Sequence, residues 1–423
     1  MTNLNRTIAL FMIAILVASC TESAFKQPSQ QINTQSITSP AAPSAMPEVY
    51  IARHPAPVDI SGYYLELTSI PKFDPTEFWK VDLRSRNLTK INMSHSLADL
   101  LYATYDSKTQ WPSSDKIPAG FDWQGILEAG KDPGLGIREL HEHGINGKGV
   151  SIAIIDQPLI VEHIEYGSQI RLYEEINIAP DTVSQMHGPA VASLAAGRTV
   201  GVAPDVNLYY IAAWAFDPSD PSQGTDYRFT AQALRRLIDL NKDLPEEQKI
   251  RAVSMSIGLN PEANGYDEFF SAIQAVKDEG MFPIVVSLDR TYGWNMLGLG
   301  RDARSDPNDF SSYEPASWLK EEFFEKRVPA STLLIPMESR TTASQTGAQD
   351  YVFWGQAGMS WTVPYLAGVY ALAVQVDPDI TPEQFWETAL ETGRTTQIQH
   401  DGKEYEFGVI LDPQALIKAI KSQ

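Results

Sequence analysis

The chain of 423 residues contains a single cysteine, Cys20, so no disulfide can form within it. Positive charge is also scarce, because 33 lysines and arginines face 53 aspartates and glutamates, which gives a formal net charge of −20. A chain this acidic lacks the basic surface that phosphate backbones require, which argues against a nucleic-acid partner. The seven histidines form no cluster with the spacing of metal ligands, so the sequence predicts no metal site and no other cofactor.

The N-terminus has the pattern of an export signal. Residues 8–17 are wholly apolar and follow Arg6, but this run is too short to cross a bilayer as a stop-transfer helix. The stretch VASC at residues 17–20 resembles the lipobox of bacterial lipoproteins, which implies cleavage before Cys20 and attachment of lipid to it. Residues 1–19 are therefore predicted to be a lipoprotein signal peptide, and the chain an extracytoplasmic protein held on a bacterial membrane by its lipid. An ordinary secretory signal peptide is the alternative.

Two further regions precede the main body of the chain. Residues 20–47 are rich in Ser, Thr, Gln, Ala and Pro, a composition typical of a flexible tether. Residues 48–146 show weak periodicity, with short strands expected at 63–67 and 78–83 and helices at 97–105 and 136–143. This region is interpreted as an N-terminal accessory segment, a propeptide-like segment or a substrate-side lid.

From Gly149 onward, apolar β-branched runs alternate with amphipathic stretches. This alternation predicts an α/β fold with a mainly parallel sheet, whose ligands would lie at the carboxyl ends of the strands. The expected strands are 150–155, 207–213, 252–257, 284–288 and 333–337, and the expected helices are 189–196, 230–241, 268–279 and 362–375.

Three residues in this region have the types and positions needed for acyl transfer. Asp156 directly follows the first strand, His187 opens an apolar helix, and Ser360 stands at the start of another. Nucleophilic catalysis by serine needs a base within hydrogen-bond reach and a carboxylate that orients it. Taken singly, Asp156 could be a turn residue, His187 a packed or capping residue, and Ser360 an N-cap.

The local motifs around these residues resemble those of the subtilisin-like serine peptidases, or subtilases. The resemblance is carried by GKGVSIAIID (147–156), HGPAVASLAAG (187–197), VGVAPDVNLYYIAA (200–213), SMSIG (254–258) and GMSWTVPYLAG (358–368). It implies a doubly wound α/β fold with helices on both faces of the sheet, a peptidase domain at residues 147–423, and a triad of Asp156, His187 and Ser360.

The sequence departs from the family pattern around each triad residue. Gln157 follows Asp156 where a small hydroxyl residue is usual, and Pro189 and Ala190 stand in the histidine motif where Thr and a second His are expected. Around Ser360, the residues Met359, Trp361 and Tyr365 replace Thr, Met and His. These changes alter the surroundings of the triad without removing any of its members.

The oxyanion donor is a larger departure. The family places an asparagine soon after the strand read here as 284–288, but this chain has Asp289 nearest that position and no asparagine before Asn295. Asn295 is the predicted donor, and the alternative is a site that uses backbone N–H groups alone. Structural calcium, common in the family, has no convincing oxygen-rich loop here, since DARSDPND (302–309) has the composition of a solvated loop.

The predicted function is that of a serine endopeptidase acting on polypeptides. A catalytically silent relative that binds peptides or a surface partner is the main alternative. An α/β-hydrolase lipase is excluded by chain order, because that fold places its serine before the acid and the histidine, whereas Ser360 comes last here.

Overall fold

The computed structural model describes residues 49–60, 67–77, 79–213, 225–326, 328–329 and 331–422. The expected signal peptide, Cys20, the whole expected tether and residues 63–66 of the first expected strand lie outside the described residues. Within those that are described, no helix combines the length and the apolar character that crossing a membrane requires.

The main sheet has six strands in the order β1-β4-β5-β3-β6-β7, and every pairing within it is parallel. It confirms the mainly parallel α/β fold predicted from the alternating pattern. The strands are β1 (Tyr50–Ile51), β3 (Ser151–Asp156), β4 (Ile170–Ile176), β5 (Asn207–Ala213), β6 (Ile250–Met255) and β7 (Phe282–Val285).

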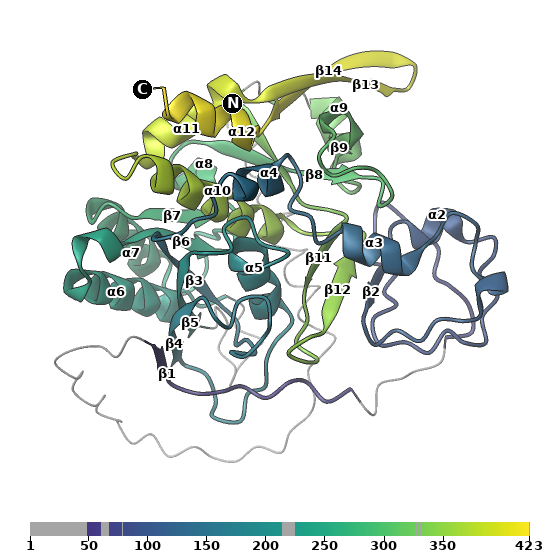
Figure 1. Cartoon of the computed structure of the whole chain (residues 1–423), viewed down its shortest axis with the longest axis horizontal. Coiled ribbons are helices and arrows are strands. Elements are labelled where there is room, and N and C mark those ends of the chain that lie inside the picture. The colour runs from purple at the N-terminus through teal and green to yellow at the C-terminus, as the bar shows by residue number, and fades with distance from the viewer. Residues whose placement is uncertain are drawn as a thin grey trace.

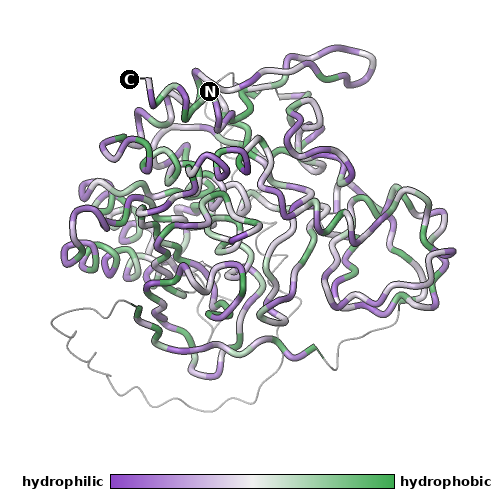
Figure 2. Tube along the Cα trace, viewed as in Figure 1, coloured by the Kyte–Doolittle hydropathy of each residue, from purple (hydrophilic) through white to green (hydrophobic). Residues whose placement is uncertain are grey.

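Helices cover both faces of this sheet. Successive side chains of a strand point in opposite directions, so the apolar strands present hydrophobic side chains on both faces. Ile152 and Ile154 of β3 pack in one core with α5 (His187–Ala196) and α10 (Thr362–Val376), whereas Ala153 and Ile155 pack in a second core with α6 (Arg228–Asp243) and α7 (Tyr266–Asp278). Figure 1 shows the two layers of helices, and Figure 2 shows apolar residues concentrated on the strands between them.

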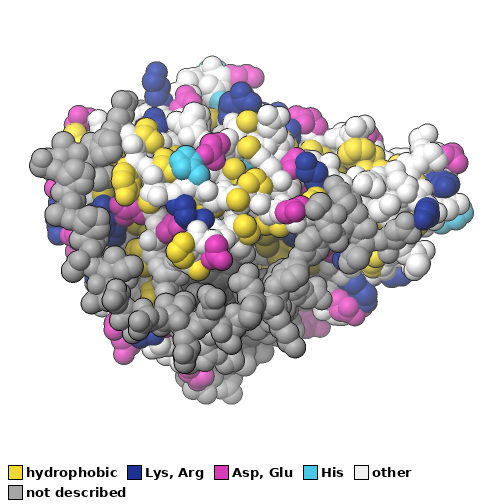
Figure 3. All heavy atoms as spheres, turned by 90° about the horizontal axis from the view of Figure 1, so that it is seen from below, with side chains coloured by type: hydrophobic (Ala, Val, Ile, Leu, Met, Phe, Trp, Pro, Cys, Tyr) yellow, Lys and Arg dark blue, Asp and Glu magenta, His cyan; other side chains and the backbone are white. Residues whose placement is uncertain are grey.

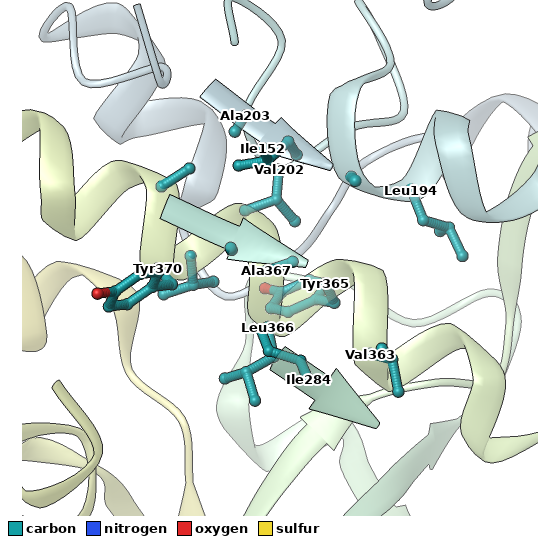
Figure 4. Close-up of a cluster of buried hydrophobic side chains, with 14 of the residues drawn as sticks. Ile152, Leu194, Val202, Ala203, Ile284, Val363, Tyr365, Leu366, Ala367 and Tyr370 are labelled. Carbon is teal, nitrogen blue, oxygen red and sulfur yellow. The ribbon is translucent and has the colours of Figure 1, made fainter. Parts of the chain in front are cut away.

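Helix α10 is the centre of the first core. It is apolar on all sides, and its residues from Thr362 to Val374 are buried. Figure 4 shows Leu366 beside Ile284 of β7, while Ala367 lies toward Val202. A helix that is hydrophobic all round belongs in the interior of a large domain, so the segment that follows Ser360 is rigidly held.

A second sheet has five strands in the order β13-β14-β10-β8-β9. Its strands are β8 (Asn295–Arg301), β9 (Tyr313–Pro315), β10 (Thr332–Pro336), β13 (Arg394–His400) and β14 (Lys403–Ile410). Four helices lie before, between and after these strands in the chain: α8 (Leu288–Thr291), α9 (Lys320–Lys326), α11 (Pro382–Thr392) and α12 (Pro413–Ile420).

Residues 67–126 form a body with its own small core, called here the N-terminal lobe. Figures 1 and 3 show it as a projection on the right-hand side of the molecule. Its core contains Leu83, Met93, Tyr105 and Phe121, together with Phe353 from the main body. Its regular elements are short: α2 (Leu97–Leu100), β2 (Thr104–Asp106), a 3-10 turn (Ser114–Lys116) and the start of α3 (Trp123–Ala129).

The lobe is joined to the main body by strand pairing. β2 pairs antiparallel with β12 (Tyr351–Trp354), which pairs in turn with β11 (Arg340–Ala343). The predicted helix at 97–105 was therefore wrong beyond its first turn, because residues 104–106 are recruited into this sheet. The described residues of the strand expected at 78–83 form only an isolated bridge between Asp82 and Thr104, whereas α4 (Ile137–Glu142) confirms the helix expected at 136–143.

Candidate active site

Asp156 and His187 meet at the carboxyl edge of the main sheet. Asp156 is the last residue of β3, and His187 is the first residue of α5. The Oδ1 atom of Asp156 lies 2.7 Å from Nδ1 of His187, and the side chains are 4% and 14% exposed respectively. A buried carboxylate on Nδ1 fixes the orientation and the tautomer of the imidazole, and it turns Nε2 toward the other side of the ring.

Gln157, one of the departures from the family pattern, supports this pair. Its backbone N–H donates to Asp156 Oδ1 at 2.8 Å, and its side-chain oxygen accepts from the backbone N–H of His187 at 3.2 Å. Its carbonyl accepts from the Tyr210 hydroxyl. A Cβ on Gly188 would lie 2.3 Å from that carbonyl oxygen, so only glycine allows α5 to approach so closely.

Ser360 lies in a 3-10 turn (Met359–Trp361) that leads directly into α10, and it is 7% exposed. Its hydroxyl donates to the carbonyl of Ser256 at 3.3 Å, and the Ser256 hydroxyl donates to the Ser360 carbonyl at 2.8 Å. Ser256 follows the end of β6, which is the strand next to β3, so Ser360 is held at the same sheet edge as Asp156. Its hydroxyl makes this bond instead of one to His187.

Trp361, the residue directly after Ser360, contacts the ring of His187. Its ring packs edge-on against the His187 ring, with centroids 5.4 Å apart, and also against Trp354, with centroids 5.2 Å apart. Among the described residues its indole N–H has no hydrogen-bond partner. Met359 and Tyr365 are buried in the core around α10. The unusual neighbours of Ser360 are therefore packing residues, and Trp361 is the one that contacts the imidazole.

Asn295, the predicted oxyanion donor, lies at the start of a strand of the second sheet. After β7 the chain turns back, and the rings of Tyr292 and Trp294 pack against Phe282, the first residue of that strand. Asn295 then begins β8. The next residue, Met296, lies with its Sδ atom 3.8 Å from the hydroxyl of Thr362, two residues after Ser360. The role of Asn295 as oxyanion donor stays a prediction. Asp289, nearest to the family position, is exposed, and it is preceded by the buried apolar Leu288.

A buried carboxyl that the sequence pattern did not single out is linked through Ser317 to Gln356. Glu338 accepts from the backbone N–H and the hydroxyl of Ser317 at 2.8 and 2.7 Å. The Ser317 hydroxyl in turn accepts from the Gln356 amide at 3.0 Å. Burial raises the pKa of Glu338 to about 8, although the donors on Ser317 pull the pKa the other way. Glu338 follows an apolar strand, as Asp156 completes one, so the same signal could have found it.

The described residues contain no group of three or more His, Cys, Asp or Glu side chains arranged to hold a metal ion. His163 is buried, and its Nε2 lies 3.0 Å from the carbonyl of Asp350. In the acidic loop at 302–309, Asp302 is paired with Arg304 and Asp309 accepts from Ser311. These carboxylates are engaged within their own loop.

The chain was compared with known families and structures. Residues 147–409, more than half of the chain, match the model of the Subtilase family. Among solved structures, the fold is similar to that of the prenylagaramide maturation protease PagA, with 14% sequence identity and a TM-score of 0.47. That alignment covers 68% of this chain and 99% of PagA.

Proposed function

The chain belongs to the subtilase family of serine peptidases, and we propose that it hydrolyses peptide bonds of polypeptides through Asp156, His187 and Ser360. The observation that carries the proposal is the 2.7 Å hydrogen bond between the Asp156 carboxylate and His187 Nδ1. It supplies an oriented base at the edge of the sheet that also holds Ser360.

In this mechanism the Ser360 hydroxyl leaves the Ser256 carbonyl, turns toward His187 and attacks the peptide carbonyl carbon. His187 Nε2 takes the hydroxyl proton and then delivers it to the leaving amine, and water releases the acyl group in a second cycle. Asp156 stabilises the imidazolium that forms in between. The 3.3 Å bond of Ser360 to Ser256 is long and easily exchanged, as is common for nucleophiles in free enzymes.

The backbone N–H of Ser360 is the oxyanion donor in this proposal. Asn295 is not included, because no observed contact among the described residues ties its side chain to the triad, and Leu288 just beyond β7 is apolar. The absence of one oxyanion donor typically costs about 10²–10³ in turnover. We therefore expect a slow peptidase.

We propose further that the peptidase acts outside the cytoplasm from a lipid on Cys20. The proposal rests on the apolar run, the lipobox-like VASC and the polar tether of the sequence. Growth of expressing bacteria with an alkyne-bearing fatty acid should label the wild-type protein but not the Cys20→Ser variant. Equal labelling of both proteins would rule out this anchor.

The experiment for the triad is labelling with a fluorophosphonate, which reacts with activated serines. Wild type should be labelled, Ser360→Ala should not, and His187→Ala should react about 10²–10⁴-fold more slowly, as expected for the loss of a general base. Ser254→Ala is the matched control, because it removes the hydroxyl of another buried serine in the neighbouring strand β6. Undiminished labelling of Ser360→Ala would contradict the assignment.

A catalytically silent, peptide-binding relative is the second candidate. It is favoured by the Ser360 hydroxyl bonding to Ser256 and by the apolar Leu288 just beyond β7. A folded wild-type protein that resists the probe, cleaves no member of a broad peptide library and still binds peptides would favour this candidate.

A further inference from the structure

The N-terminal lobe touches the segment that leads into Ser360. The indole N–H of Trp79 donates to the carbonyl of Gln356 at 3.0 Å, and the backbone N–H of Trp79 donates to the side-chain oxygen of Gln356 at 3.2 Å. Gln356 precedes Ser360 by four residues. These two bonds fix both the backbone and the side chain of Gln356 from the lobe side.

The backbone of Trp79 is itself unusual. Its φ of 57° lies in the left-handed region, which bulky residues rarely adopt. Such a conformation persists only where the surrounding contacts over-determine it, and it clusters at functional sites. The contacts with Gln356 and with the ring of Trp354 are among those that hold it here.

A continuous series of ring contacts runs from the lobe to the imidazole. Trp79 packs against Trp354 with centroids 5.4 Å apart, Trp354 against Trp361 at 5.2 Å, and Trp361 against His187 at 5.4 Å. Arg84 of the lobe also lies over the Trp354 ring, 4.9 Å from its centroid. Trp354 and Trp361 are fully buried, so neither ring can move without disturbing the next.

The two backbones also meet directly. The N–H of Gly355 donates to the carbonyl of Ala103 at 3.1 Å, and a Cβ at position 355 would lie 2.4 Å from the carbonyl carbon of Tyr102. Contact this close excludes any other side chain at position 355. On the far side, the Gln356 amide donates to Ser317 at 3.0 Å, so the segment is held from both directions.

We propose that the N-terminal lobe is a permanent part of the catalytic unit and not a removable prosegment, with Trp79 as a positioning residue for the nucleophile. Trp79 holds the segment from Gln356 to Ser360 through its hydrogen bonds, and it holds His187 through the rings of Trp354 and Trp361. The inference rests on the proposed peptidase function, because positioning matters only if Ser360 reacts.

The first test asks which form of the protein is active. The fluorophosphonate-labelled protein, purified from the expressing cells, is digested and mapped by mass spectrometry. The labelled species is expected to contain residues 67–126 in full. A labelled species that begins after residue 126 would overturn the proposal.

The second test compares Trp79→Ala with Trp111→Phe. Trp111 lies in the same lobe, where it stacks on Trp123 and contacts Tyr105 and Phe121, so its substitution controls for general loosening of the lobe. Displacements of about 1 Å in such sites cost about 10²-fold. Trp79→Ala should therefore lower kcat on a fluorogenic peptide about 10–100-fold with KM within twofold of wild type, whereas Trp111→Phe keeps kcat. Equal kcat for Trp79→Ala and wild type, or an equal fall in both variants, would refute the positioning role.

The third measurement separates this inference from the proposed function. Hydrogen exchange of the peptide spanning residues 355–361 does not depend on turnover. Exchange there should rise at least about tenfold in Trp79→Ala and stay unchanged in Trp111→Phe. If wild type fails to react with the probe but exchange still rises, the peptidase function fails while the structural coupling stands; unchanged exchange refutes the coupling itself.

Discussion

The peptidase domain and the N-terminal lobe meet behind Ser360, but they are held together in different ways. In the domain, extended strands alternate their side chains between two large cores, and helices such as α10 are buried along their length. In the lobe, the regular elements span three to seven residues each. Regular strands and helices therefore organise the domain, whereas individual side-chain contacts organise the lobe.

Polar side chains organise the turns of the lobe. Buried Asp106 accepts from the backbone and the hydroxyl of Ser85, from the backbone of Lys108 and from the hydroxyl of Thr109. Asp99 similarly accepts from Lys72 and from the backbone of Phe73. Side chains of this kind replace the ladder bonds of regular elements. A segment with weak hydrophobic periodicity can thus be well ordered when carboxylates satisfy its backbone.

The largest effect is expected from Phe353→Ala, which tests whether the two parts are separable at all. Phe353 belongs to β12 of the main body, yet its ring is fully buried in the core of the lobe against Tyr105. Its truncation should lower the free energy of unfolding by about 3–5 kcal/mol. Chemical denaturation followed by tryptophan fluorescence measures this loss; a loss below about 1 kcal/mol would show that the lobe is only loosely attached.

Glu338, at the junction of the two parts, should make stability depend on pH. Its pKa of about 8 lies above the ordinary value of 4.5, because burial favours the neutral form. Between these two values the folded protein holds a proton that the unfolded chain has released, so stability falls as pH rises and levels off above pH 8. The total change is on the order of a few kcal/mol.

Denaturation midpoints measured from pH 4 to pH 9 test this expectation. Glu338→Gln should flatten the slope between pH 5 and 8, whereas Glu314→Gln, which alters a more exposed carboxylate paired with Lys320, should change it far less. An unchanged slope in Glu338→Gln would show that another group is responsible.

Asp106→Ala tests the role of carboxylates in the lobe. It leaves the buried N–H and hydroxyl of Ser85 without their acceptor, which typically costs about 1–3 kcal/mol. Thr109→Val serves as a comparison, because it removes the Thr109 hydroxyl but leaves the Asp106 carboxylate its bonds to Ser85 and Lys108. Native-state hydrogen exchange should show faster exchange within residues 81–110 and unchanged exchange in β3 and β6. Loss of protection in both parts alike would mean that they unfold as one unit.

The smallest effects are expected from helix caps, which occur in both parts. Thr381 forms a capping box with Gln384 at the start of α11, and Asp122 accepts from Gly125 at the start of α3. Each change to Ala should cost about 1 kcal/mol. A shift in melting temperature of similar size for Thr381→Ala and Asp122→Ala is expected; a markedly larger shift for Asp122→Ala would indicate that the lobe depends more strongly on single polar contacts.

The sequence predicted the domain far better than the lobe, for a physical reason. Strand β5 was predicted with its observed bounds, and Asp156 and His187 were expected at one sheet edge, because burial on both faces leaves a clear apolar pattern. In the lobe, the apolar spacing around Leu97 and Leu100 suggested a longer helix. That preference is overridden by pairing with β12, a partner far away in the sequence.

The role of Asn295 stays a prediction, because ring packing decides the path of the chain that leads to it. After β7 the rings of Tyr292 and Trp294 pack on Phe282, and the chain then enters β8 at Asn295. Ring packing of this kind has no period in the sequence. The contact between Trp79 and Gln356 could not be predicted from the sequence either, because the two residues are 277 positions apart.

The pairing of β2 with β12 has a consequence for biogenesis. Thr104 pairs with Trp354, and the intervening chain comprises most of the peptidase domain. During synthesis the lobe emerges first and must wait for its partner strand, with an unpaired edge and part of its apolar core exposed to other chains. Closing so long a loop costs little more entropy than closing a moderate one, but it is slow. The lobe can therefore complete its sheet and its core only after residues 351–354 have been synthesised.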